Sequence, residues 1–235
     1  MGKIWAIASG SGGVGKTTLA LSLAAGAAQR GHSTILVDAS GSTRSCDLVL
    51  GLESVMSLDL VDVLSQQLDI NAALYAVPQC AKLRIANASL YENAALAEFS
   101  GLMLALQSMC DVLVIDLKTG ELPAREGLLT HEDELILVTR PDDASMRSTE
   151  RLVQLTRGCE FGCSIVVNRI QRDKVRRGRQ YANEAVSVTL DCPVMGSIAE
   201  DDGCVSEIVS GKAARGIANW MNSPVKGILN QLLNR

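Results

Sequence analysis

Apolar and polar positions divide the chain into short hydrophobic runs separated by longer helical patterns. The hydrophobic runs do not alternate with polar positions, which is typical of strands that are buried on both faces. They predict strands at residues 4–8, 33–37, 83–86, 112–115, 134–138, 164–167 and 193–198. The stretches between them predict helices from Lys16 to a stop at Gly31 and at residues 93–108, 144–156, 175–186, 201–210 and 224–233.

Buried strands that alternate with helices of about ten or more residues predict a three-layer α/β fold, in which a mostly parallel, twisted sheet is covered by helices on both faces. The 235 residues are 47% hydrophobic and have a mean hydropathy of +0.18, which supplies enough apolar material for a sizeable core. No internal repeat, low-complexity tract or linker is visible, so we expect residues 1–235 to form a single domain.

The strongest chemical signal is the stretch ASGSGGVGKTT at residues 8–18. Residues 10–17 fit the phosphate-loop pattern G-x-x-x-x-G-K-[ST], and they lie between a predicted strand and a predicted helix. Glycines let backbone N–H groups turn toward phosphate oxygens, and the helix N-terminus adds its positive dipole end. Lys16 would reach the β- and γ-phosphates, and Thr17 would place its hydroxyl on Mg²⁺. We therefore prefer nucleotide binding in a P-loop NTPase fold over a glycine-rich turn that binds nothing.

Two aspartates close predicted strands at the same edge of the sheet as this loop. Asp38 ends the strand STILVD, and Asp116 ends the strand DVLVID. Either carboxylate could hold Mg²⁺ directly or through water, although an aspartate at this position can also cap the following turn. Together with Thr17 they form the candidate metal site, and with Lys16 they form the candidate catalytic set.

The stretch SGSGGVGKTTLALSLAAGAAQRGHSTILVD resembles the MinD/ParA family of dimerising ATPases, and within it the MinD type. The resemblance continues through VDASGSTRSCDLVLGL and DVLVIDLKTG, which match the two switch segments, and through VVNR and VMGSIAEDD toward the C-terminus. It implies ATP or ADP with Mg²⁺ as ligands, a homodimer, a protein partner or regulator, and a role in cellular positioning such as placement of the division septum.

The resemblance also implies positions for the nucleotide. Asn168, with Arg169 beside it, matches the adenine-side position, although an asparagine after IVV otherwise only ends a strand. Ile198, Glu200 and Asp201 match the loop that borders the base. The residues implied around the phosphates are Gly10, Ser11, Gly12, Gly13, Val14, Gly15, Lys16, Thr17 and Thr18.

Three departures from the family pattern bear on activity. Ser11 stands where the family has a signature lysine that crosses the dimer interface, and Ser40 stands where a second aspartate orients the attacking water. Lys118 replaces a proline of the second switch. Because phosphoryl transfer depends on positioning and charge stabilisation, we expect weak dimerisation and slow ATP hydrolysis with binding retained. Lys118 could supply charge near the terminal phosphate, but a solvated switch-loop lysine is the favoured interpretation.

A basic segment at residues 169–179 stands out in a chain of net charge −4 and pI 5.3. The overall charge argues against a protein that coats nucleic acid. The segment itself could bind DNA phosphates or an anionic membrane surface, although a solvated helix face or a contact with a partner protein is favoured. Its basic residues are Arg169, Arg172, Lys174, Arg176, Arg177 and Arg179.

Location is inferred from what the sequence does not contain. No apolar run approaches the ~20 residues that span a bilayer, and the first strand runs straight into the phosphate loop, which leaves no room for a signal peptide. We expect a cytoplasmic protein that could reach the membrane periphery through a partner. The C-terminal helix has an apolar stripe that we expect to pack on the sheet and not on a membrane: Val225, Ile228, Leu229, Leu232 and Leu233.

Seven cysteines form an odd, scattered set, which predicts reduced thiols. Cys159 and Cys163 are four residues apart, and we interpret them as residues flanking a turn and not as a metal pair. His32 and His131 have no nucleophile pattern near them, so a hydrolase triad is not indicated.

The main hypothesis for the function of the whole chain is an ATP-dependent switch. The alternative is a non-hydrolysing ATP-binding scaffold, like the degenerate relatives that help place pili or flagella.

Overall fold

The computed structural model describes residues 1–41, 45–88, 96–120, 122, 129, 133–201 and 223–234. The N-terminal half of this part of the chain contains β1 (Lys3–Ala8), α1 (Lys16–Gln29), β2 (Thr34–Ala39), α2 (Ser45–Leu50), α3 (Leu60–Gln66), the 3₁₀ helix η1 (Ile70–Ala73), β3 (Tyr75–Ala76), β4 (Leu83–Asn87) and α4 (Leu96–Ser108). The C-terminal half contains β5 (Val112–Leu117), β6 (Glu134–Thr139), α5 (Asp143–Thr156), β7 (Gly162–Ile170), α6 (Arg172–Arg176), α7 (Asn183–Leu190), β8 (Val194–Ala199) and α10 (Ser223–Leu233).

The described strands form one sheet of eight strands in the order β3-β4-β2-β5-β1-β6-β7-β8. Every pairing is parallel except that of β3 with β4. The pairing places Asp38 of β2 opposite both Asp116 of β5 and Asn87 of β4. Parallel strands bring their carboxyl ends to one edge, so these polar residues lie at the edge from which the β1–α1 loop also leaves.

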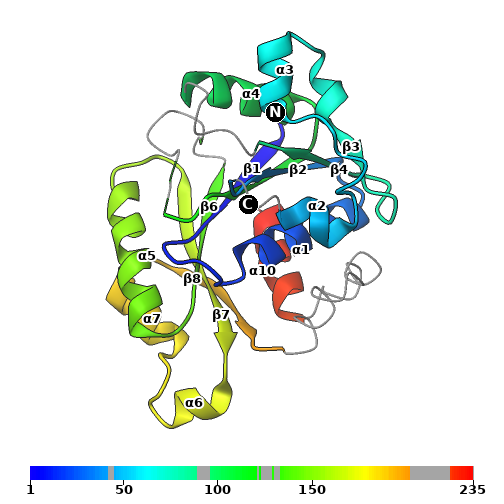
Figure 1. The fold of residues 1–235 in the computed structure, drawn as a ribbon. Helices are drawn as coiled ribbons and strands as arrows, with labels where there is room; N and C mark the ends of the chain where they lie inside the picture. The colour runs from blue at the N-terminus through cyan, green and yellow to red at the C-terminus, as the bar shows by residue number, and fades with distance from the viewer. Residues whose placement is uncertain are drawn as a thin grey trace.

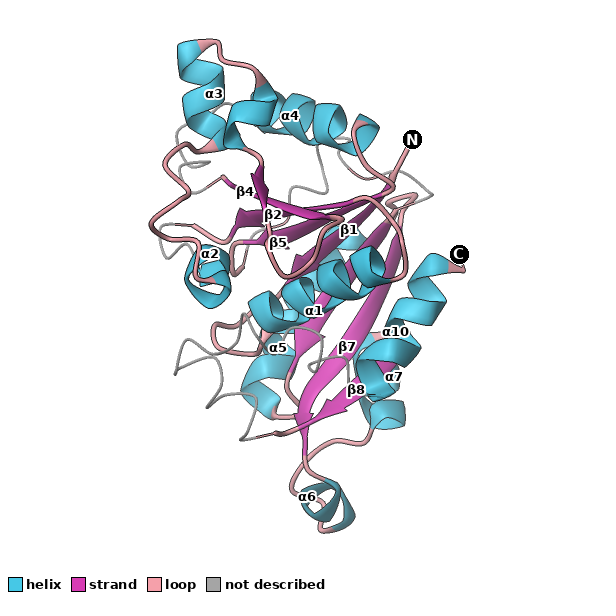
Figure 2. Ribbon diagram, turned by 90° about the vertical axis from the view of Figure 1, so that its right-hand side faces the viewer, coloured by secondary structure: helices cyan, strands magenta, loops and turns pink. Residues whose placement is uncertain are grey.

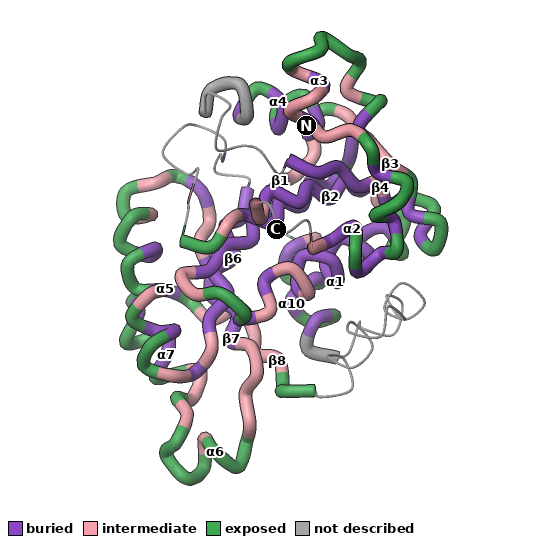
Figure 3. The backbone as a smooth tube through the Cα atoms, viewed as in Figure 1, coloured by how far each residue is buried: buried purple, intermediate pink, exposed green. Residues whose placement is uncertain are grey.

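Helices cover both faces of the sheet, which confirms the predicted three-layer fold (Figures 1 and 2). Successive residues of a strand point to opposite faces, so β1 supplies Trp5 and Ile7 to one core and Ile4 and Ala6 to the other. The first core packs under α1, α2 and α10, and the second under α3, α4, α5 and α7. The central strands β1, β2, β5 and β6 are therefore buried along almost their whole length (Figure 3).

The predicted strands are all present, but one predicted helix is wrong. Residues 175–186 form no continuous helix, because α6 ends at Arg176 and α7 begins at Asn183. The break is at Gly178, whose positive φ of 66° is a left-handed conformation that ends a helix. The elements α2, α3, η1 and β3 lie outside the predicted ranges. The predicted helix at 201–210 falls outside the described residues, apart from Asp201.

The C-terminal helix packs as its apolar stripe predicts. The helix α10 contacts β8 and α1. Its residues Val225, Ile228, Leu229 and Leu232 are buried in the first core, and Leu233 packs against that core. Gly196 of β8 makes the close approach of this helix feasible, because a Cβ there would lie 2.8 Å from Ile228 Cγ1. The apolar face of α10 is therefore used in packing on the sheet.

Candidate functional site

The loop between β1 and α1 has a backbone shape that only glycine adopts easily. Gly13 and Gly15 have positive φ values of 67° and 95°, and a Cβ on Gly12 or Gly13 would meet no atom within 4 Å. The α1 helix begins at Lys16, and Gly15 at its N-cap offers no side chain to the first-turn N–H groups. The outer part of the loop is thus open, and no side chain caps the first turn of α1. This is the arrangement that binds phosphate at a helix N-terminus.

Two neighbouring elements, α5 and β7, pack closely against the loop. A Cβ on Gly10 would collide with the backbone of Ser148 in α5, and one on Gly15 would collide with Asn168 Nδ2 at the end of β7. Ser11 Oγ shares a hydrogen bond of 2.5 Å with Ser148 Oγ. Ser11 is therefore tied to α5 within the same chain.

Lys16 and Thr17 both bind Asp116 in this structure. Lys16 Nζ donates to Asp116 Oδ1 at 2.7 Å, and Thr17 Oγ1 donates to Oδ2 at 2.6 Å. Lys16 is 7% exposed and Asp116 is fully buried. Burial raises the pKa of Asp116, while the Lys16 ammonium and the two hydrogen bonds oppose that rise. The structure thus brings these three residues together, and their roles toward a nucleotide stay a prediction.

Asp38 organises the turn after β2. Its Oδ1 accepts from the Ser40 N–H at 3.0 Å and from Ser40 Oγ at 2.5 Å, and its Oδ2 accepts from the Cys46 N–H at 2.9 Å at the start of α2. Asp38 thus performs the turn-capping role that the sequence left open, while it also stands beside Asp116. Ser40 is itself bound to Asp38.

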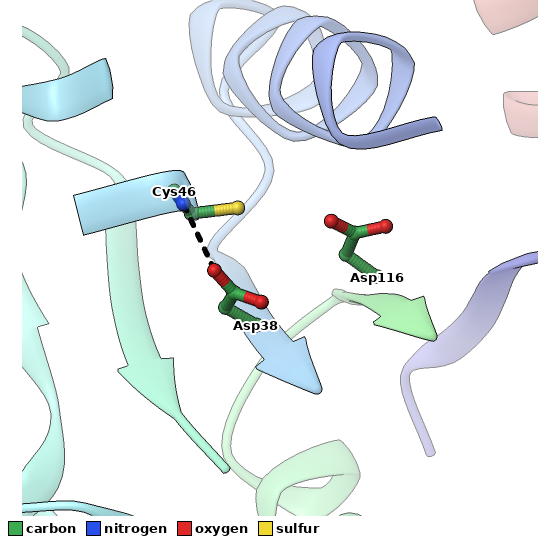
Figure 4. Close-up of side chains that lie close together, drawn as sticks. All are labelled: Asp38, Cys46 and Asp116. Atoms are coloured by element: carbon green, nitrogen blue, oxygen red, sulfur yellow. Dashed lines mark hydrogen bonds between the residues drawn. The ribbon is translucent and has the colours of Figure 1, made fainter. Parts of the chain in front are cut away.

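A thiol that the sequence reasoning missed completes this cluster. Ligand atoms of Asp38, Cys46 and Asp116 lie within 4.8 Å of one another, with the Cys46 side chain pointing toward Asp116 (Figure 4). Burial, and then the two carboxylates, raise the pKa of the Cys46 thiol well above its usual range. A protonated thiol is a poor ligand for Mg²⁺, whereas the Thr17 hydroxyl and the two carboxylates are the oxygen donors that this ion prefers. The oxygen donors therefore fit Mg²⁺.

The predicted base-side residues gather at the ends of β7 and β8. Asn168 Nδ2 donates to the Val14 carbonyl at 2.7 Å, and its Oδ1 accepts from the Arg169 N–H at 2.9 Å. The Glu200 N–H donates to the Ile170 carbonyl at 3.1 Å, and the Glu200 carboxylate accepts from Gln171. Ile198 packs against the first core, and Asp201 follows Glu200. Asn168 is thus next to the phosphate loop.

Lys118 follows β5 on the other side of the loop. A Cβ on Gly41 would lie 3.7 Å from Lys118 Cδ, so the aliphatic stem of the lysine passes the turn after β2. The Gly120 N–H donates to the Ser9 carbonyl at 2.8 Å, which ties this second switch segment to the start of the phosphate loop. Whether the Lys118 ammonium acts on a phosphate stays a prediction.

The basic segment extends away from the sheet around α6 (Figure 1). Every basic residue in it except the half-buried Arg169 is exposed. Beside it lies a groove with a volume of about 460 Å³. The lining residues are Ile170, Arg172, Val175, Arg176, Ala182, Asn183 and Glu184. The segment is separate from the Lys16–Asp116 cluster, and its ligand stays a prediction.

A glycine loop that joins a central parallel strand to a helix, with lysine, threonine and aspartate at its base, defines a P-loop nucleotide-binding protein. Residues 5–213 match the family described as the CobQ/CobB/MinD/ParA nucleotide binding domain. The chain belongs to this family.

Named relatives agree with this membership. The septum site-determining protein MinD of Helicobacter pylori is 29% identical over 217 residues, which cover 88% of this chain and 81% of the relative. In the solved MinC:MinD cell division protein complex of Aquifex aeolicus, the matching chain superposes with a TM-score of 0.87 at 23% identity, covering 99% of this chain and 96% of that one. MinD of Pyrococcus horikoshii, solved with Mg-ADP, superposes with a TM-score of 0.80 at 24% identity, covering 100% of this chain and 96% of that one.

No helix in the described ranges is both long enough and apolar enough to cross a membrane.

Proposed function

We propose that the protein binds ATP with Mg²⁺ at the β1–α1 loop and acts as a nucleotide-dependent switch in cellular positioning, such as placement of the division septum. The observation that carries the proposal is the contact of the buried Lys16 and the half-buried Thr17 with the buried Asp116 at the base of an open glycine loop. The names of the relatives support it, since several are septum site-determining proteins and one was solved with Mg-ADP.

Each residue of the cluster has a task in this proposal. Lys16 exchanges its contact with Asp116 for the β- and γ-phosphates, because the phosphates offer it a larger negative charge. Thr17, Asp38 and Asp116 hold Mg²⁺ through oxygen atoms, directly or through water. When bound, the ion neutralises charge on the phosphates. The loop glycines present their N–H groups, and Asn168 and Arg169, with Ile198, Glu200 and Asp201, border the base.

Two contacts favour slow hydrolysis. The Ser40 hydroxyl is bonded to Asp38 and is neutral, so it cannot orient an attacking water as a carboxylate does. The Ser11 side chain is neutral and bonded to Ser148, and a neutral hydroxyl offers no cation to a partner's nucleotide. The same contacts favour the second candidate function, in which ATP is a structural ligand of a scaffold that helps to place pili or flagella.

The neutral Ser11 and the relatives also guide what we propose about binding partners. We propose a homodimer that is weak because Ser11 supplies no charge, together with a protein regulator, as in the solved complex of MinD with MinC. The basic segment is the proposed contact for a polyanionic surface or for that regulator.

Phosphate release by the purified chain separates the two functions. A slow, steady release of phosphate from ATP with Mg²⁺ that disappears in Lys16→Ala supports the switch. Tight retention of ATP with no phosphate release supports the scaffold. A wild-type chain that neither retains nor hydrolyses ATP would contradict both.

A further inference from the structure

Two cysteines from different elements lie side by side at the edge of the sheet opposite the phosphate loop. Cys163 is the second residue of β7, and Cys192 lies in the short connection between α7 and β8. Their Sγ atoms are 3.9 Å apart, and the Cys192 thiol also contacts the Cys163 carbonyl oxygen at 3.7 Å. No other atom fits between the two sulfurs at this distance.

The backbone brings this pair together as neighbours on parallel strands. Ile165 is opposite Val194 in the β7–β8 pairing, and the Ile165 N–H donates to the Pro193 carbonyl at 2.8 Å. Two residues before this pair along the chain come Cys163 in β7 and Cys192 in the connection that leads into β8. Adjacent strands lie ~4.8 Å apart, and a disulfide needs ~4.4–6.8 Å between Cα atoms. A bond between the sulfurs thus requires side-chain rotation and no change of strand pairing.

The two thiols differ in their surroundings. Cys163 is half-buried and Cys192 is buried. The hydrogen bond with Cys192 lowers the pKa of the Cys163 thiol, against the effect of burial, and a hydrogen bond with Thr156 acts in the same direction. The contact with Cys163, followed by burial, raises the pKa of the Cys192 thiol. Cys163 is therefore the more accessible and more easily ionised member, as expected of an attacking thiol.

We propose that Cys163 and Cys192 form a reversible oxidation site, at which a peroxide converts the two thiols to an intramolecular disulfide. The Cys163 thiolate attacks one peroxide oxygen, so an S–O bond forms, the O–O bond breaks and the leaving oxygen departs as water after taking a proton. The Cys192 sulfur then attacks the sulfenic sulfur, so the S–S bond forms and the S–O bond breaks with release of a second water. Two electrons pass from the thiols to the peroxide.

The disulfide would close a loop across a sequence separation of 29 residues. That loop contains β7, the basic segment with α6, and α7. Oxidation would therefore link the α7–β8 connection to β7. The strand β7 carries Asn168 and leads into the basic segment. An external thiol reverses the step by thiol–disulfide exchange. This inference does not depend on nucleotide binding, so its failure would leave the proposed function untouched.

The test treats the reduced full chain with hydrogen peroxide, blocks the remaining thiols by alkylation and maps the peptides by mass spectrometry. We expect a loss of the mass of two hydrogen atoms, a cross-linked peptide pair containing Cys163 and Cys192, and full reversal by dithiothreitol. Cys192→Ser should abolish the cross-link and leave a sulfenic acid on Cys163 that a dimedone probe captures.

Cys159→Ser is the matched control, because Cys159 is also half-buried and lies four residues from Cys163. This variant should form the Cys163–Cys192 disulfide as the wild type does. The proposal is overturned if the mapped disulfide joins other cysteines, if Cys163 is oxidised to sulfinic acid without any disulfide, or if the wild type keeps all its thiols under peroxide. These outcomes are read on the wild-type chain and do not require the variants to fold.

Discussion

Asp116 is the acceptor shared by the lysine and the threonine of the phosphate loop. It is fully buried, and Lys16 is nearly so, which makes their 2.7 Å contact an ion pair in a region of low dielectric. Removing one partner of such a pair leaves an uncompensated charge and costs ~3–5 kcal/mol, whereas removing both costs much less. Without nucleotide, the two residues should therefore depend on each other for stability.

A double-mutant cycle in urea checks this dependence. We expect Asp116→Asn to lower the free energy of unfolding by ~3 kcal/mol. The Lys16→Met, Asp116→Asn double variant should lose clearly less than the sum of the two single variants, because neither position then holds a charge whose partner has been removed. Losses that simply add would show that the two side chains do not interact as the structure indicates.

The approach of Lys16, Thr17 and Asp116 was predictable, because a loop motif and strand-ending carboxylates meet at one edge of any parallel sheet. The contact of Ser11 with Ser148 was not, since it joins residues 137 positions apart through packing of α5 against the loop. Cys46 likewise could not be found from the sequence. Its place beside Asp38 and Asp116 follows from the start of α2, a short helix outside the predicted ranges.

At the scale of elements, the strands that are most buried were predicted correctly by their hydrophobic patterns. The strands β1, β2, β5 and β6 are almost wholly buried, and their apolar runs predicted them. The pattern over residues 175–186 predicted one helix, but a glycine in a left-handed conformation divides it and leaves α6 as an exposed projection. Short elements such as α3 depend on local caps, here the reciprocal bonds of Asp59 and Asp62, which hydrophobic periodicity does not reveal.

The projection around α6 yields a prediction about a polyanionic surface. If the basic segment contacts DNA or anionic lipid, then replacing Arg176, Arg177 and Arg179 by Glu should abolish binding to a DNA duplex or to phosphatidylserine vesicles at low salt. The reason is that each cation releases counterions from the polyanion, which also makes wild-type binding fall steeply with added salt. Co-sedimentation with vesicles and a gel-shift assay measure the two arms, and ATP affinity should not change.

The control carries the same change in charge on another element. Arg147 and Arg151 of α5, and Arg157 directly after it, are also exposed, and their replacement by Glu should leave most of the binding intact if the α6 segment is the contact. Equal losses in both triple variants would indicate net charge as the cause. A wild type that binds neither surface at low salt would contradict the polyanion contact.

At the scale of the whole molecule, the strength of the proposed dimer depends on whether each subunit lends a positive charge to the nucleotide of the other. Because two-fold symmetry repeats every contact, one substitution changes the interface twice. Ser11→Lys should strengthen ATP-dependent self-association, and adding Ser40→Asp should raise hydrolysis, since a carboxylate can orient the attacking water. Sedimentation velocity with and without ATP, together with phosphate release, measures both effects.

Ser148→Ala serves as the control, because it removes the hydrogen bond to Ser11 without adding a cation. It should leave self-association as in the wild type. If the wild type already dimerises tightly only with ATP, and Ser11→Lys changes nothing, another cation supplies the missing charge, and Lys118→Ala is then the variant to measure.

The central claim, that the β1–α1 loop binds ATP, is tested most directly by calorimetric titration of ATP with Mg²⁺ into the wild type and into Lys16→Ala. Loss of one charge-assisted contact of ~1.5–3 kcal/mol should weaken binding at least about tenfold. Lys174→Ala, at an exposed lysine of α6, should bind as the wild type does. Equal affinity in the wild type and Lys16→Ala, or no binding by the wild type, would contradict the claim.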